Sequence, residues 1–191
     1  MALHTTPASM LKESLDETLE AAKFCANYKK TDEKWGEFVT GGCLGYPSAI
    51  LLFSLVDAIG SYFRKNKDFK ILIDGKKERI NATGWEHFKI LNSKYFNQNL
   101  SKQSLNLLYK ESRSCLTHNS VLGSNIIMVP DNTAIQPETH GKAFILIDAN
   151  SKIIHIISIK EFWELSKSAV EMFKKDIDTI VPESKQGKNF Q

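Results

Sequence analysis

Cysteine is scarce in this sequence, and its three copies lie far apart. Cys25, Cys43 and Cys115 form no C-x-x-C pair, and an odd number of cysteines cannot all pair with one another. The spacing therefore predicts neither a zinc site nor a disulfide framework. We expect a reduced protein that carries no metal and no other cofactor.

Long apolar runs are also missing. The most apolar stretch, PSAILLFSLVDAIGSYF (47–63), is short for a membrane span and contains Asp57. The start, MALHTTPASM, has no charged region followed by an apolar core, so it does not resemble a signal peptide. We expect a cytoplasmic protein without a membrane partner.

A strong net charge is the third absence, since the chain carries only +3. This total does not by itself indicate a nucleic-acid-binding surface. The charge is uneven, however, because residues 64–79 hold seven basic and three acidic side chains, a local +4. Such a segment can contact phosphates, but a solvated loop is the more common explanation of a charge run.

The first half of the chain is dominated by helical periodicity. Leucine and alanine recur at steps of three and four over 8–29, which predicts a helix with Ser9 as its N-cap. Three glycines and Pro47 interrupt the pattern over 40–48. A second helix, about 47–65, is apolar nearly all round and is therefore expected at the centre of the core.

Shorter elements follow. Asp74-Gly75 between two β-prone runs predicts a hairpin over 69–81, because both turn positions favour positive φ. The remaining elements expected are a short helix over 84–96, a helix over about 101–118, a second hairpin over 142–158, and a last helix opened by a capping box from Ser158 to Glu161.

The expected fold is mainly α, a helical bundle with one or two peripheral β-hairpins. Residues 1–122 form the bundle, and residues 123–180 add a hairpin and a C-terminal helix on the same core, giving a single domain. Residues 181–191 are expected to be a frayed tail.

Arg113 and His118 are the candidate reactive pair. Arginine can grip a phosphate with parallel hydrogen bonds, and histidine exchanges a proton near neutral pH. Together they suit metal-free cleavage of RNA. Five residues along an ideal helix rotate about 140° and rise about 7.5 Å, so the two side chains converge only if the helix ends or distorts, or if another subunit completes the pair. Asn119 is a reasonable residue for such a helix end.

The stretch LYKESRSCLTHN resembles the R-x(4–6)-H signature of the HEPN superfamily (higher eukaryotes and prokaryotes nucleotide-binding). The resemblance covers roughly residues 8–122, including the apolar helix ILLFSLVDAIGSYF. It implies a helical bundle that dimerises, with the two motifs facing a shared cleft. It further implies that Arg113 holds the scissile phosphate and that His118 is a general acid/base or positions the backbone. Catalytic members often carry Asn, Asp or His after the arginine, where this chain has Ser114.

Asp57 and Tyr109 each have a functional and a structural interpretation. Asp57 can pair with Arg113, orient His118, or lie solvated at a helix edge. Tyr109 can donate to a phosphate but is more typical of a core tyrosine with its hydroxyl at the rim. Ser114 can still hydrogen-bond. Cys115 is expected to be a buried small side chain, and His87 and His155 show no ligand spacing, His155 being expected as a satisfied strand histidine.

Three functions stay open on the sequence alone. The first is a homodimeric endoribonuclease of a bacterial defence or toxin system, with RNA and an antitoxin protein as partners. The second is a catalytically inactive HEPN-like module that dimerises or binds nucleotides or RNA, in which Arg113 holds the bundle together. The third is a helical protein that binds a small ligand or nucleotide between its helices.

Overall fold

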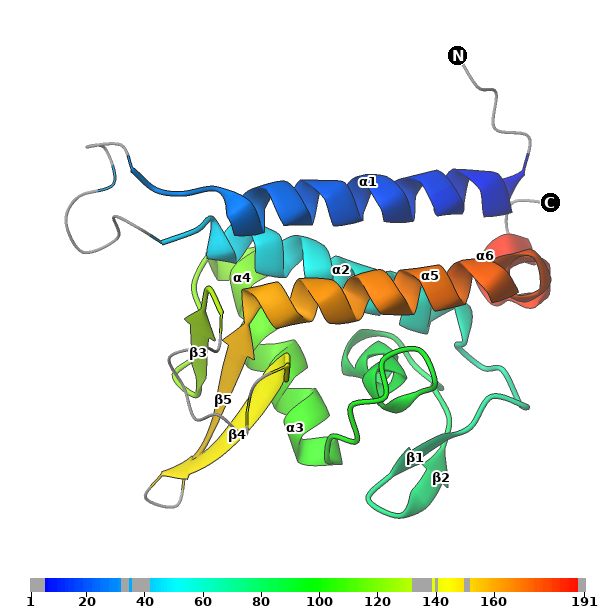
Figure 1. Cartoon of the computed structure of the whole chain (residues 1–191). Helices are drawn as coiled ribbons and strands as arrows, with labels where there is room; N and C mark the ends of the chain where they lie inside the picture. Colours follow the sequence, from blue (N-terminus) through cyan, green and yellow to red (C-terminus); the bar gives the residue numbers. More distant parts are fainter. Residues whose placement is uncertain are drawn as a thin grey trace.

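Helices dominate the computed structural model, which describes residues 6–31, 35, 42–131, 139, 141–149 and 152–188. A two-strand hairpin and a small three-strand sheet complete the described part of the chain (Figure 1). The expected mainly helical class with peripheral hairpins is therefore confirmed. None of the helices within these residues is long and apolar enough to cross a membrane.

Three long helices form the core: α1 (Pro7–Asn27), α2 (Gly45–Tyr62) and α5 (Ile159–Glu183). Helices α1 and α5 run side by side in opposite directions, and both pack on α2 (Figure 1). Leu52, Phe53 and Val56 of α2 have no exposed surface. Burial of these side chains on all sides explains why α2 is apolar nearly all round.

The N-cap of helix α1 lies three residues before the predicted cap. Thr6 is the N-cap, its hydroxyl accepting from the Ser9 backbone N–H at 3.1 Å, while the Ser9 hydroxyl accepts from the Thr6 N–H at 3.3 Å. Pro7 occupies the first helical position, where a missing N–H costs nothing. Ser9 is thus part of the capping box at its third position and is not the cap itself.

The predicted hairpin is confirmed as β1 (Ile71–Ile73) paired with β2 (Lys76–Glu78), with positive φ at both Asp74 and Gly75. The next helix is a 3₁₀ helix, η2 (Gly84–Asn92), which ends four residues before the predicted boundary. Asn92 closes it, because its side chain bonds both the N–H and the carbonyl of Leu100, at 2.7 and 2.6 Å.

The helix predicted over 101–118 is present but divided into three parts. Helix α3 (Lys102–Leu107) leads into a π-helical segment, η3 (Leu108–Ser114), which is followed by α4 (Cys115–Asn119). The left-handed residue that ends α4 is Ser120, with φ 57°, and not Asn119. The helix is therefore distorted before His118, one of the conditions named for convergence, because the π-helical segment contains Arg113.

The second hairpin is confirmed as β4 (Phe144–Ala149) and β5 (Lys152–Ser158), which pair antiparallel. A third strand, β3 (Ile126–Val129), was not predicted; it pairs with β5 in parallel and places Ile126 opposite His155. Four residues followed by Pro130 are too few for a pattern of alternation. A parallel partner also leaves no turn signal, because the two strands are not adjacent in the chain.

The C-terminal part differs from the expected frayed tail. Helix α5 continues through Pro182 to Glu183, and α6 (Lys185–Lys188) follows. Val181 and Ser184 are buried, and the Gln186 side chain donates to the Ser61 carbonyl at 2.7 Å. These contacts order residues 181–188, whereas 189–191 lie outside the described residues. Ser158 is the N-cap of α5 as predicted, but its hydroxyl donates to the Glu161 carboxylate instead of capping the backbone.

Candidate functional site at Arg113

The Asp57 carboxylate links two side chains from distant parts of the chain. Its Oδ2 accepts from Arg113 Nη2 at 3.0 Å, and its Oδ1 lies 2.6 Å from His87 Nδ1. About a quarter of the Arg113 and Asp57 side chains is exposed, whereas the His87 side chain is 7% exposed. Of the alternatives for Asp57, pairing with Arg113 is confirmed. We call Asp57, His87 and Arg113 the polar triad.

The π-helical segment presents Arg113 to Asp57. Glu111, at its centre, is held by the loop that follows α4: its backbone carbonyl accepts from Gly123 N–H at 2.7 Å, and its carboxylate accepts from the backbone and side chain of Asn125 at 2.9 and 2.8 Å. The wider turn of the π-helical segment leaves the Glu111 carbonyl available to accept the bond from Gly123. Short π-helical segments inside α-helices occur frequently at functional sites.

Tyr109 lies in the same segment and lines the triad. Its ring meets Phe88 edge-on at 5.3 Å, and the Arg113 guanidinium carbon lies 5.8 Å from its centre. The ring is half-buried against the hydrophobic core. Packing in the core is therefore confirmed for Tyr109, and its ring supplies a π face for the guanidinium.

The structure separates the other predicted site residues from the triad. His118 and Asn119 are exposed at the end of α4, and neither makes a side-chain hydrogen bond or ion pair in the described part of the chain. Ser114 is half-buried and shows no side-chain hydrogen bond among the same residues. Cys115 is also half-buried, with a free thiol. Arg113 and His118 therefore do not contact one another within one copy of the chain.

His87 is the partner that sequence reasoning missed. It lies 30 positions after Asp57 on a different element, so no spacing rule links the two. The only sequence signal is Gly60, on the face of α2 that η2 crosses. A Cβ at position 60 would lie 2.3 Å from the His87 carbonyl oxygen, so glycine is required for η2 to approach α2 this closely.

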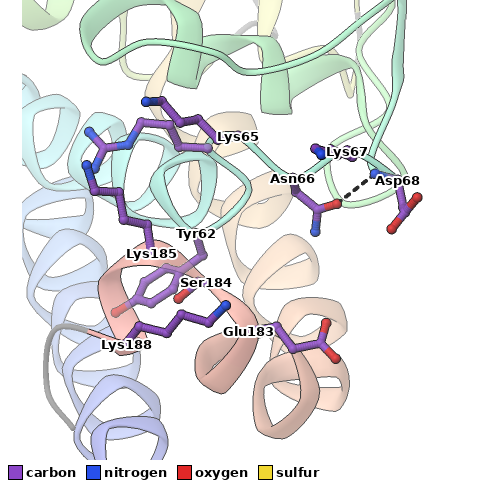
Figure 2. Close-up of a pocket in the computed structure, with 10 residues that line it drawn as sticks. Tyr62, Lys65, Asn66, Lys67, Asp68, Glu183, Ser184, Lys185 and Lys188 are labelled. Atoms are coloured by element: carbon purple, nitrogen blue, oxygen red, sulfur yellow. Dashed lines mark hydrogen bonds between the residues drawn. The ribbon is translucent and has the colours of Figure 1, made fainter.

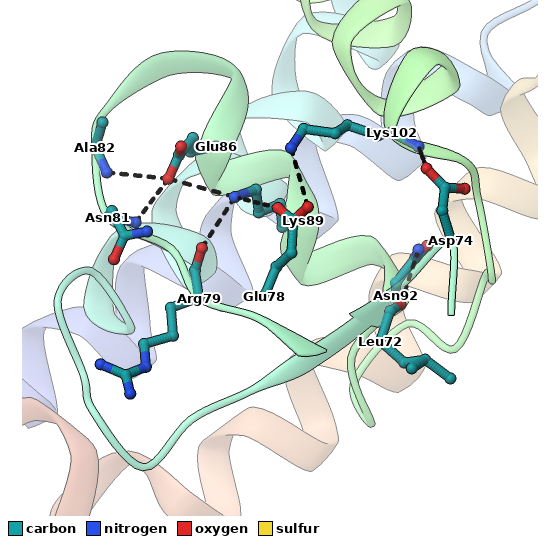
Figure 3. A network of polar contacts seen from close by, with 10 residues as sticks. All are labelled: Leu72, Asp74, Glu78, Arg79, Asn81, Ala82, Glu86, Lys89, Asn92 and Lys102. Atoms are coloured by element: carbon teal, nitrogen blue, oxygen red, sulfur yellow. Dashed lines mark hydrogen bonds and ion pairs between the residues drawn. The ribbon is translucent and has the colours of Figure 1, made fainter. Parts of the chain in front are cut away.

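A second polar network anchors η2 and with it His87 (Figure 3). Lys89, whose side chain is 3% exposed, reaches Glu78 at 2.9 Å and Glu86 at 3.5 Å, and donates to the Arg79 carbonyl at 3.0 Å. Glu86 also accepts from the backbone N–H groups of residues 81 and 82. Hydrogen bonds from Lys89 and Lys102 lower the pKa of Glu78 below its ordinary value.

The chemistry of the triad follows from its donors and acceptors. A carboxylate only accepts, so His87 Nδ1 donates to Asp57. In the neutral imidazole this leaves Nε2 as an acceptor, and that atom is buried without a partner among the described residues. The guanidinium has five N–H donors, of which one is bonded to Asp57; Nε has no acceptor in the described part of the chain. The arrangement thus combines a fixed cation with an oriented imidazole.

His155 is fully buried on β5, and neither ring nitrogen has a partner within the described residues, so it is not the satisfied strand histidine expected. Burial lowers its pKa, opposed by the charge of Glu111. No cluster of three or more His, Cys, Asp or Glu side chains suited to a metal ion is present among those residues.

Comparison with profiles of known protein families, with curated proteins and with solved structures found no match to this chain.

Proposed function

We propose that the protein is a metal-independent endoribonuclease that acts as a homodimer in the cytoplasm, within a bacterial defence or toxin system. The observation that carries the proposal is the polar triad. Asp57 fixes one edge of the Arg113 guanidinium, while most of its N–H donors have no acceptor among the described residues. A held, partly exposed guanidinium suits bidentate binding of a phosphate.

The proposed reaction uses the RNA itself as the nucleophile. The ribose 2′-hydroxyl attacks the adjacent phosphorus, the bond to the 5′-oxygen breaks, and a cyclic phosphate and a 5′-hydroxyl result. Arg113 stabilises the extra negative charge on the phosphorane oxygens. His118 exchanges a proton with the attacking or the leaving oxygen. One proton leaves the 2′-hydroxyl and one is added to the 5′-oxygen, so the step needs no net proton.

The separation of His118 from Arg113 makes a second copy part of this proposal. His118 is exposed on α4. We propose that it meets the Arg113 of another chain, so that each site combines Arg113 with the partner subunit's His118. The resemblance of LYKESRSCLTHN to the HEPN motif supports such a shared cleft. An antitoxin protein that covers the cleft is the partner that a toxin of this kind requires.

A second candidate function has its own supporting observation. Each carboxylate oxygen of Asp57 has a partner, Arg113 for Oδ2 and His87 for Oδ1, and the imidazole is buried. A triad closed in this way can act purely as a structural tie between α2, η2 and η3. The corresponding function is a catalytically inactive HEPN-like module that dimerises or binds RNA.

Cleavage of a fluorescently quenched RNA by the purified chain in EDTA tests the proposal. We expect Arg113→Ala and His118→Ala each to reduce kcat/KM at least 100-fold, while Lys110→Ala, an exposed neighbour on η3, stays within twofold of wild type. His118→Ala should leave Tm unchanged because His118 is exposed. A wild-type protein that cuts no RNA refutes the endoribonuclease and leaves the inactive module.

Mixing the two inactive variants tests the shared site. If each site takes its arginine and histidine from different copies, half of the randomly mixed dimers carry one intact site, and about a quarter of wild-type activity returns. Sites contained within one chain predict no recovery.

A further inference from the structure

A basic pocket of about 480 Å³ lies at the C-terminal end of α2, and none of the triad residues lines it (Figure 2). Its walls come from two segments more than a hundred residues apart: the end of α2 with the loop after it, and the α5–α6 corner. The lining residues are Tyr62, Arg64, Lys65, Asn66, Lys67, Asp68, Glu183, Ser184, Lys185 and Lys188.

The charge of the pocket is strongly one-sided. Five of its side chains are cationic and two are anionic, a balance of +3 that equals the formal charge of the whole chain. In the view of Figure 2, Lys65 and Lys185 extend along one side, while the carboxylates of Asp68 and Glu183 lie on the other. None of the five cations forms an ion pair within the described part of the chain. Lys94, another exposed lysine, does have a carboxylate partner in Asp176.

The fold holds these cations together. The bond from Gln186 to the Ser61 carbonyl fastens α6 to the end of α2. Gly187 lets the chain pass Val181 closely, because a Cβ there would lie 1.7 Å from the Val181 carbonyl oxygen. Lys185 and Lys188 flank these two anchors and therefore face the basic loop. Concentrating like charges costs free energy, which an anionic ligand would recover.

One donor in the pocket lacks an acceptor. Arg64 Nε is shielded from solvent and has no hydrogen-bond partner among the described residues. Buried polar atoms are nearly always satisfied, so an unpaired guanidinium N–H points to a missing acceptor. A phosphate oxygen would supply both the acceptor and the negative charge.

We propose that this pocket binds the phosphodiester backbone of single-stranded RNA. The inference rests on the proposed function in taking RNA as the ligand. Four of the five cations are lysines, which act as point charges on flexible stems and suit a backbone read without sequence preference. Tyr62 is the one aromatic residue of the lining, which argues against a pocket that reads bases by stacking on several rings. The pocket thus holds a substrate strand whose cleavage occurs at the triad.

The size of the effect follows from counterion release. For single strands the salt slope is about −0.7 per phosphate contact, so each contact contributes roughly fivefold to affinity at 0.1 M salt. Replacing Lys185 and Lys188 with glutamate removes two contacts. We therefore expect binding weaker by about 25-fold, with a salt slope shallower by about 1.4.

The assay is fluorescence anisotropy with a labelled 2′-O-methyl RNA, which cannot be cleaved because it lacks the attacking hydroxyl. Lys76→Glu/Lys77→Glu is the matched control, since it makes the same charge change on the exposed hairpin of the same basic segment. We expect less than threefold weakening for this control. Equal weakening by both pairs overturns the inference, because it indicates a general charge effect.

A second double variant tests whether a loss of binding comes from misfolding. Lys67→Glu/Lys188→Glu changes both walls of the pocket and should reproduce the loss, with circular dichroism confirming the fold. Vesicles containing phosphatidylserine are the alternative probe. Binding of the wild type to vesicles but not to the RNA overturns the inference in favour of a lipid surface.

The two proposals fail separately. If Lys185→Glu/Lys188→Glu changes neither kcat/KM for RNA cleavage nor the Kd for the oligonucleotide, the pocket does not bind RNA. The endoribonuclease proposal then still stands. RNA binding that depends on the pocket without any cleavage refutes the endoribonuclease and leaves an RNA-binding module.

Discussion

Replacing Asp57 with alanine removes the carboxylate that joins Arg113 to His87 and should clearly destabilise the fold. Two hydrogen bonds to a charged group are lost, each worth about 1.5–3 kcal/mol when buried. The quarter exposure of Asp57 and Arg113 reduces the value, so we expect a total of about 3 kcal/mol. For a chain of this length that corresponds to a fall in Tm of about 6–12 °C.

Urea unfolding, followed by circular dichroism, measures this loss. Asp178→Ala is the control, since Asp178 also pairs with a cation, Lys12, but its side chain is 70% exposed. We expect a cost below about 1 kcal/mol there. The double variant Asp57→Ala/Arg113→Ala should be about 1.5 kcal/mol more stable than additivity predicts. If Asp57→Ala costs no more than Asp178→Ala, the triad does not tie the three elements together.

Two further substitutions probe the elements around the triad. Gly60→Ala should destabilise the fold by more than about 3 kcal/mol and shift the His87 imidazole resonances, because the new Cβ meets the His87 carbonyl. Gly45→Ala is the control, because a Cβ there makes only ordinary contacts, 3.7 Å from Cys43 Sγ and 3.9 Å from the Ile159 side chain. Lys89→Met should cost about 3 kcal/mol by leaving Glu78 and Glu86 without their buried cation, whereas Lys102→Met, with a half-exposed side chain, should cost less than about 1 kcal/mol. Because the pKa of Glu78 is lowered in the folded state, its contribution is present above about pH 4.3 and is lost as pH falls through the folded value. Unfolding at pH 7 and pH 3 should accordingly show a smaller acid loss for Lys89→Met, and an unchanged acid loss would exclude this network as its source.

The sequence predicts the long helices and both hairpins because their signals are local. Periodic apolar residues mark α1 and α5, a nearly continuous apolar run marks α2, and Asp74-Gly75 marks the turn between β1 and β2. What it does not predict depends on distant contacts. Strand β3 exists only as a parallel partner of β5, and the order of residues 181–188 comes from packing against Ser61 and neighbouring residues.

The candidate site can also be predicted only in part from the sequence. The pairing of Asp57 with Arg113 can be anticipated, because a charge in an apolar helix needs a partner. The role of His87 cannot, since a 3₁₀ helix brings it to Asp57 across 30 positions. The π-helical turn is equally invisible in the sequence, because the residues of η3 are also compatible with an ordinary α-helix. It decides how Arg113 and His118 are oriented relative to one another.

The pairing of α1 with α5 affects how the protein folds as it is synthesised. Trp163 donates to the Leu19 carbonyl at 3.0 Å, and Lys174 pairs with Asp16 at 2.6 Å, so the apolar face shared by α1 and α2 is completed only by α5. The ribosome must add 121 residues between the end of α2 and the end of α5. At roughly 5–20 residues per second this takes about 6–24 s, during which the face of α2 that α5 covers lacks its partner. Chaperones that bind apolar segments therefore have their main opportunity during this interval, before α5 closes the core.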